Sequence, residues 1–152
     1  MHLIIERFHS GRVGAALLAL RVVTGIAFIF HGLPKVRDPA AFAEMMQLPP
    51  ALGFIAAWTE VLGGALLVLG LLTPVAALFL TVQMLVAIFR VHLPAGDPFV
   101  GTGGSSWELA AVYLVVNVAL LLAGPGAYSL DALLARRLVA ADGQPGRRRG
   151  LA

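Results

Sequence analysis

Four long apolar runs constrain this chain more than any other feature of its sequence. They cover residues 13–33, 51–72, 75–93 and 107–123. As α-helices of roughly 17–22 residues they would be about 25–33 Å long, which matches the hydrocarbon core of a bilayer. The chain is also 59% hydrophobic and only 12% charged, against roughly 25% charged residues in soluble domains. We therefore predict an all-α fold, an integral membrane four-helix bundle with short connections.

Proline and glycine separate the runs. We expect Pro34 to end the first run and Pro49–Pro50 to open the second. Thr73–Pro74 separates runs two and three so tightly that their helices must be antiparallel neighbours. The predicted organisation is an N-terminal arm at 1–12, the bundle at 13–123, an amphipathic surface segment at 124–138 and a basic, disordered tail at 139–152.

Basic residues predict the orientation in the membrane. Four spans put both termini on one side, where Arg7, Arg12 and the five arginines of residues 136–149 gather. In the opposite loops, 34–50 and 94–106, the only basic residues are Lys35 and Arg37. The positive-inside rule then places both termini in the cytoplasm, in a bacterial cytoplasmic membrane. Basic clusters beside an apolar bundle indicate lipid rather than nucleic acid as the partner.

Polar residues inside the runs are costly and need partners. Counted from the ends of their runs, Arg21 and Glu60 both lie near the midplane. We predict a buried Arg21–Glu60 ion pair, which either fixes the helix register or belongs to a proton or anion path. On the second run, Gly63, Gly64 and Gly70 share the face of Glu60, so this face should pack inward.

A second polar cluster is predicted at the outer ends of the helices. It is formed by His31, Arg90, His92 and Glu108, and a stripe at i, i+4 and i+7 joins Gln83 and Ala87 to Arg90. The histidines could ligate haem or a metal, donate hydrogen bonds to a quinone carbonyl, or belong to a structural network. The sequence favours the structural network, then quinone, then haem, and we assign no metal ligands.

A faint internal duplication accompanies these positions. AFIFHGLP at 27–34 is similar to AIFRVHLP at 87–94, and each is followed by a Trp–Glu entry to the next span. The pattern indicates two related helical hairpins in parallel orientation. Convergence of helix-end chemistry is the alternative.

Together these segments resemble the DoxX family of small bacterial four-helix membrane proteins. The resemblance rests on RVVTGIAFIFHGLPK (21–35), WTEVLGGALLVLGLLTPVAAL (58–78), VAIFRVHLPAG (86–96) and WELAAVYL (107–114), and extends to the closing GPGAYSLDALL. It implies a link to thiosulfate oxidation with quinone as acceptor, or to membrane oxidoreductase complexes that handle oxidative stress. It singles out Arg21, His31, Lys35, Glu60, His92 and Glu108. The chain has no cysteine, which argues against a direct thiol relay.

Two classes of function follow. The first is a quinone-linked subunit or accessory of a membrane oxidoreductase, which would not be catalytic alone and would bind the quinone in the outer polar cluster. A soluble or membrane partner would then supply the metal or flavin chemistry. The second is a non-redox bundle that binds or transports a small molecule or lipid, or scaffolds a membrane complex. Either class is compatible with a homo-oligomer.

Overall fold

The computed structural model describes residues 8–142, and in this part of the chain every regular element is a helix. The elements are α2 (Gly11–Arg37), α3 (Pro39–Met45), α4 (Pro50–Leu69), α5 (Thr73–Val86), the π-helix η1 (Ala87–His92), α6 (Glu108–Ala123) and α7 (Leu130–Asp142). The predicted all-α class is confirmed. Residues 1–7 and 143–152, which include most of the predicted arm and tail, lie outside the described range.

Among residues 8–142, three helices are long and apolar enough to cross a membrane. They are α2, α4 and the continuous helix α5–η1, with 27, 20 and 20 residues. α6 is apolar too, but its 16 residues give about 24 Å, which is less than the roughly 30 Å of a hydrocarbon core. The predicted fourth span is therefore present as a helix shorter than the other three.

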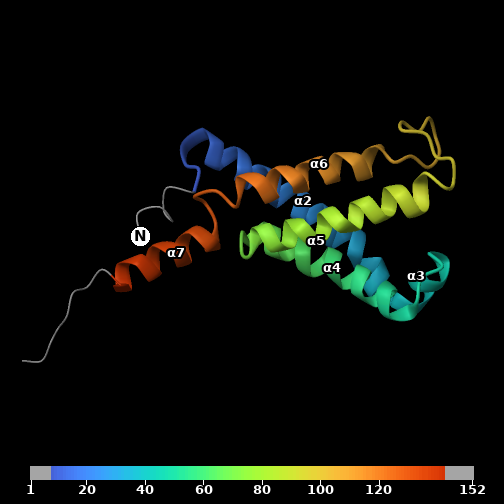
Figure 1. Ribbon diagram of the computed structural model, residues 1–152, viewed down its shortest axis with the longest axis horizontal. Helices are drawn as coiled ribbons and strands as arrows, with labels where there is room; N and C mark the ends of the chain where they lie inside the picture. The colour runs from blue at the N-terminus through green and yellow to red at the C-terminus, as the bar shows by residue number, and fades with distance from the viewer. Residues whose placement is uncertain (1–7, 143–152) are drawn as a thin grey trace, which may run out of the picture.

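The long helices pack as two hairpins (Figure 1). α2 makes its most extensive contacts with α4, and α5 with α6, while α4 and α5 join the two pairs. This is the pairing expected from the order of the predicted hairpins. Whether the two are related by duplication stays a prediction.

Glycine lets α2 and α4 approach closely. A Cβ atom on Gly25 would lie 2.5 Å from the carbonyl oxygen of Gly64, and one on Gly64 would lie 2.6 Å from that of Gly25. Only small residues allow two helix backbones to come this near. Glu60, Gly63 and Gly64 are all buried, so the prediction that this face of α4 packs inward is confirmed.

The prediction that the first helix ends at Pro34 is wrong. The helix contains Pro34 and continues to Arg37. Asp38 then caps α3, because its Oδ1 accepts a hydrogen bond of 3.0 Å from the Ala41 amide and Pro39 occupies the first helical turn. The predicted 34–50 loop therefore holds the last turn of one helix and the whole of another.

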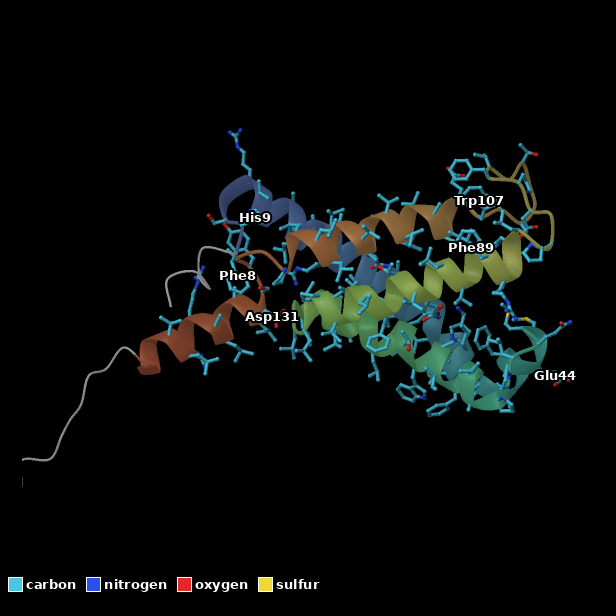
Figure 2. The ribbon with its side chains drawn as sticks, in the orientation of Figure 1. Phe8, His9, Glu44, Phe89, Trp107 and Asp131 are labelled. Atoms are coloured by element: carbon cyan, nitrogen blue, oxygen red, sulfur yellow. The ribbon has the colours of Figure 1, made fainter. Side chains whose placement is uncertain are left out.

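The two ends of the bundle differ. At one end the start of α2 lies beside the α6–α7 connection, where the Ala127 amide donates a 2.8 Å hydrogen bond to the His9 carbonyl. Figure 2 shows His9 and Asp131 at this end, and Glu44 and Trp107 at the other. α7 leaves the bundle here and runs to Asp142, four residues beyond the predicted surface segment. Both ends of the described chain thus lie on one side.

Candidate functional site

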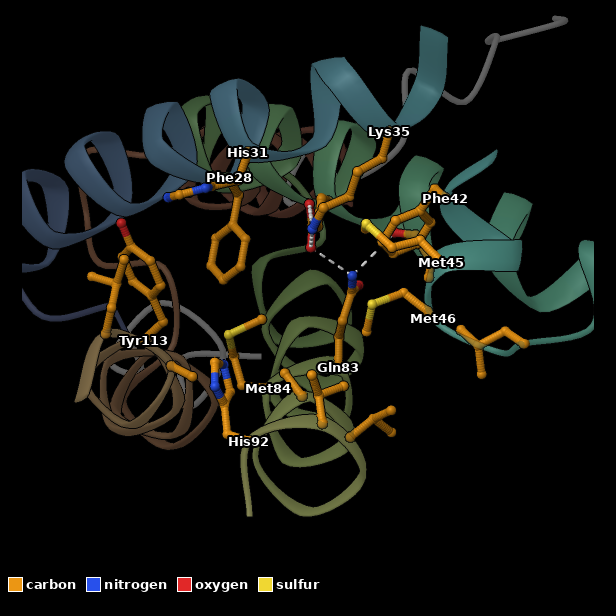
Figure 3. A pocket seen from close by; sticks show the side chains of 18 of the residues that line it. Phe28, His31, Lys35, Phe42, Met45, Met46, Gln83, Met84, His92 and Tyr113 are labelled. Carbon is orange, nitrogen blue, oxygen red and sulfur yellow. Dashed lines mark hydrogen bonds and ion pairs between the residues drawn. The ribbon is translucent and has the colours of Figure 1, made fainter. Parts of the chain in front are cut away.

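A pocket of about 390 Å³ opens at the end of the bundle that carries α3. Figure 3 shows α2 and α5–η1 on opposite sides of it, with α6 and α3 flanking them. Aromatic and methionine side chains supply much of its lining: Phe28, Phe42, Met45, Met46, Met84 and Tyr113. Its volume and its mostly apolar walls are those of a small-molecule site.

Glu60 is the buried centre of a polar network on the wall of this pocket. Its carboxylate accepts hydrogen bonds of 2.6 and 2.7 Å from Lys35 Nζ and one of 2.7 Å from Gln83 Nε2. The Gln83 amide also donates to the Ala56 carbonyl at 3.2 Å. Glu60 is 3% exposed and Lys35 is 29% exposed. Side chains from α2, α4 and α5 therefore converge on one carboxylate that borders open space.

The predicted Arg21–Glu60 pair is wrong, because Glu60 pairs with Lys35 instead. Gly32 is the residue of α2 that lies against Glu60, and Arg21 is eleven residues earlier. Eleven residues of helix correspond to about 16 Å, too far for a salt bridge. Counting inward from the ends of the runs misplaced both residues, since α2 continues past Pro34 and brings Lys35 onto its last turn.

Arg21 is bound at the opposite end of the bundle. Its Nη1 donates to the Leu67 carbonyl at 3.0 Å and its Nη2 to the Tyr128 carbonyl at 2.6 Å. Leu67 lies in the last turn of α4, where the helix dipole favours a cation. The guanidinium is fully buried and ties α2 to the end of α4 and to the segment before α7. We call Arg21 with these two carbonyls the Arg21 clamp.

Asp131 reinforces the same end. Its carboxylate accepts hydrogen bonds of 2.8 and 3.0 Å from the Leu72 and Thr73 amides, at the start of α5. A carboxylate at a helix N-terminus satisfies free amides and complements the dipole. Its own amide donates to the Gly70 carbonyl at 2.9 Å. The start of α7 is therefore fastened to the α4–α5 turn.

The π-helix η1 decides which side chains of the third span face the pocket. Gln83, Ala87 and His92 line it, whereas Arg90 is exposed and does not. In a π-helix the hydrogen bonds run from i to i+5, so each turn holds an extra residue. The predicted stripe from Gln83 to Arg90 assumed α-helical spacing, and its assignment of Arg90 to the polar cluster is wrong. The wider turn puts His92 in the pocket and Arg90 outside.

His92 is held by the loop that follows η1. Its Nδ1 lies 2.7 Å from Asp97 Oδ2, and the Ser105 hydroxyl donates to the same oxygen at 2.7 Å. These hydrogen bonds, the one from Ser105 first, lower the pKa of the Asp97 carboxyl below its ordinary value. Asp97, in the loop that follows η1, is therefore the partner of a pocket residue.

His31 and Tyr113 also belong to the polar part of the lining. Their rings meet edge to face with centroids 6.1 Å apart, and the Phe28 and Tyr113 centroids are 5.0 Å apart. The structure thus brings together His31 and His92 from the predicted outer cluster, and adds Lys35, Glu60 and Gln83 to them. Glu108 is exposed at the start of α6 and is not part of the lining.

Several lining residues were missed from the sequence. Phe42 and Met45 lie on α3, and Met46 is its C-cap. Their i, i+3, i+4 spacing after the Asp38–Pro39 cap could have revealed an amphipathic helix. Tyr113 lies five residues after Glu108 in a mostly apolar helix, and no local pattern in the sequence distinguished it. Within the described residues, no group of three or more metal-ligating side chains is close enough together to hold a metal ion.

Known proteins place this chain in a family. The DoxX family model matches residues 16–93. A Bacillus subtilis protein named "Putative oxidoreductase CatD" is 32% identical over 117 residues, which are 75% of this chain and 83% of that protein. An uncharacterized membrane protein of Mycobacterium tuberculosis is 32% identical over 139 residues, which are 82% of this chain and 85% of that protein.

An uncharacterized Haemophilus influenzae protein is 33% identical over 126 residues, which are 76% of this chain and 87% of that protein. No solved structure matches the chain. The match to the family model covers half of the chain, and the relatives are matched over most of their length. The resemblance in the sequence is thereby confirmed, and the chain belongs to the DoxX family.

Proposed function

We propose that this protein binds a quinone head group in the pocket and acts as a quinone-linked subunit or accessory of a membrane oxidoreductase. One observation carries the proposal: the pocket combines apolar, aromatic walls with a buried charged network inside a bundle of membrane helices. A quinone is a flat, lipophilic ring with polar oxygens at opposite edges. The name of the Bacillus subtilis relative supports a redox role.

The residues fit such a ring. Phe28, Met84 and Tyr113 offer apolar surfaces to its faces, and methionine adapts readily to ligand shape. The Tyr113 hydroxyl and the His31 ring nitrogens are candidates to bind the quinone oxygens. When bound, the quinone would supply the capacity to take up and release electrons together with protons.

The Lys35–Glu60–Gln83 network has a second part in the proposal. Charged side chains inside a membrane bundle are costly, and many of those that are present belong to binding sites or proton paths. Glu60 is bound to Lys35 and lies on the pocket wall, so in this proposal the pair orients the ligand and exchanges protons with it. The second redox centre would belong to a partner protein.

The proposed orientation puts the pocket at the outer face of the bacterial cytoplasmic membrane. Arg12, Arg136 and Arg137 lie at the end where α2 begins and α7 leaves. The positive-inside rule makes that end cytoplasmic. The pocket lies at the other end, which carries α3 and the 93–107 loop.

Two measurements test the proposal. Organic extraction of the purified protein should release a bound quinone, and the protein in lipid nanodiscs should bind duroquinone in isothermal titration calorimetry. Ala110→Leu, which fills the pocket from α6, should weaken binding roughly tenfold or more. Ala119→Leu, the same change at an exposed position of α6, is the matched control and should leave affinity unchanged.

If no quinone is extracted or bound, the quinone proposal fails. Extraction of a lipid or another small molecule in its place, displaced by Ala110→Leu, would support the non-redox binding alternative. Thermal unfolding of both variants shows whether the bundle is intact.

A further inference from the structure

The bond between His92 and Asp97 leaves one edge of the imidazole for the pocket. His92 lines the pocket, whereas Asp97 does not. Nδ1 is occupied by the Asp97 carboxylate at 2.7 Å. The ring nitrogen that remains available to a ligand is therefore Nε2.

Three hydrogen bonds hold Asp97 in place. Its amide donates to the His92 carbonyl at 3.0 Å, an i to i+5 bond that continues the wide turns of η1. Its carboxylate binds His92 Nδ1 and accepts the Ser105 hydroxyl. A fixed carboxylate beside one ring nitrogen keeps the proton of a neutral histidine on that nitrogen.

We propose that, where the His92 ring is neutral, Asp97 holds it as the Nδ1–H tautomer, so that Nε2 accepts a hydrogen bond and the pocket binds hydroquinone more tightly than quinone. The inference rests on the proposed function and adds the redox form of its ligand. Asp97 is then a positioning residue that acts through His92.

The preference follows from donor and acceptor chemistry. Quinone oxygens only accept hydrogen bonds, so a carbonyl beside Nε2 would bring two lone pairs together. A hydroquinone hydroxyl donates to Nε2. The Tyr113 and Ser106 hydroxyls also line the pocket, but they can rotate to donate or accept and do not discriminate. At the ligand oxygen that lies beside Nε2, the selectivity therefore depends on His92.

The test compares both forms of one compound. Calorimetry with durohydroquinone under argon, and with duroquinone, should give hydroquinone affinity roughly tenfold higher, the value of about one hydrogen bond. Asp97→Asn should reduce this ratio to about one or below, because the introduced amide can donate to Nδ1 and move the ring proton to Nε2. Ser105→Ala keeps the His92–Asp97 bond and should retain the ratio.

An independent readout is the tautomer itself. Nitrogen-15 NMR of histidine-labelled protein at pH 9, with His92→Gln for assignment, should show Nδ1 protonated in the native protein and lose that signature in Asp97→Asn. Equal or tighter binding of duroquinone, or a proton on Nε2 in the native protein, would overturn the inference. Binding of duroquinone alone would leave the proposed function standing, whereas binding of neither form would remove both.

Discussion

The bundle buries two charged side chains in different ways. At the end where α7 begins, Arg21 is fully buried and donates to two backbone carbonyls. At the other end, Glu60 is almost as buried but binds the side chains of Lys35 and Gln83 and borders a pocket. Backbone carbonyls bind the charge of Arg21, whereas side chains next to a pocket bind the charge of Glu60.

This difference distinguishes a buried charge that fastens helices together from one that a ligand could contact. Backbone carbonyls cannot change protonation, so the Arg21 clamp can only fasten α2, the end of α4 and the segment before α7 together. A carboxylate and an amine can exchange protons, and those of Glu60 and Lys35 lie where a ligand could reach them. Intramembrane charge by itself does not mark a site, but charge beside a pocket does.

The largest effect should come from removing the clamp. Arg21→Met keeps a long apolar side chain but removes the charged donor to the Tyr128 carbonyl and to the Leu67 carbonyl, which then accepts from the Gly70 amide alone. Two hydrogen bonds from a charged group make a loss of about 3–5 kcal/mol in the free energy of unfolding reasonable. An SDS titration followed by circular dichroism measures it.

Arg90→Met is the matched control for this change. Arg90 is exposed, so the same substitution should change the free energy of unfolding by no more than about 0.5 kcal/mol. Equal losses for the two arginines would mean that the clamp contributes nothing specific.

Breaking the pocket network should cost less. Glu60→Gln removes the charge but leaves an oxygen that can accept from Lys35, whose side chain is 29% exposed and can reach polar surroundings. We expect a loss of about 1–2 kcal/mol in the same titration, together with weaker duroquinone binding. A loss as large as that of Arg21→Met would contradict the distinction between a sealed and an accessible charge.

The smallest effect concerns acid pH. The pKa of Asp97 is lowered by its hydrogen bonds with Ser105 and His92, so its contribution to the stability of the 93–107 loop is complete above the ordinary aspartate pKa of about 3.9. The contribution disappears as the pH falls through the lowered value. Hydrogen exchange at the Asp97 amide, corrected for the intrinsic rate, should therefore accelerate in this range.

Asp97→Asn should show no such acceleration, since nothing titrates at that position. If the native protein and the variant respond alike to acid, Asp97 does not fasten the loop.

Much of the architecture was readable from the sequence. The apolar runs, the tight Thr73–Pro74 connection and the glycines beside Glu60 predicted the long helices, their hairpins and the inward face of α4 correctly. These features are local in sequence, and hydrophobicity and backbone constraints determine them directly.

The partners of the buried charges were not readable. Arg21 and Glu60 looked complementary, but pairing depends on the offset between neighbouring helices, which the close contact of Gly25 with Gly64 sets. The π-helical turn that exchanges Arg90 for His92 leaves no recognisable signal in AIFRVH. Register and helix type are tertiary outcomes, so the sequence identified most of the polar residues of the pocket and misassigned their contacts.

Double-mutant cycles test the central claim, that the two buried charges are separate. The claim predicts a coupling free energy of roughly 1 kcal/mol or more between Lys35→Met and Glu60→Gln, and one within about 0.5 kcal/mol between Arg21→Met and Glu60→Gln. Strong coupling of Glu60 with Arg21, and none with Lys35, would contradict it.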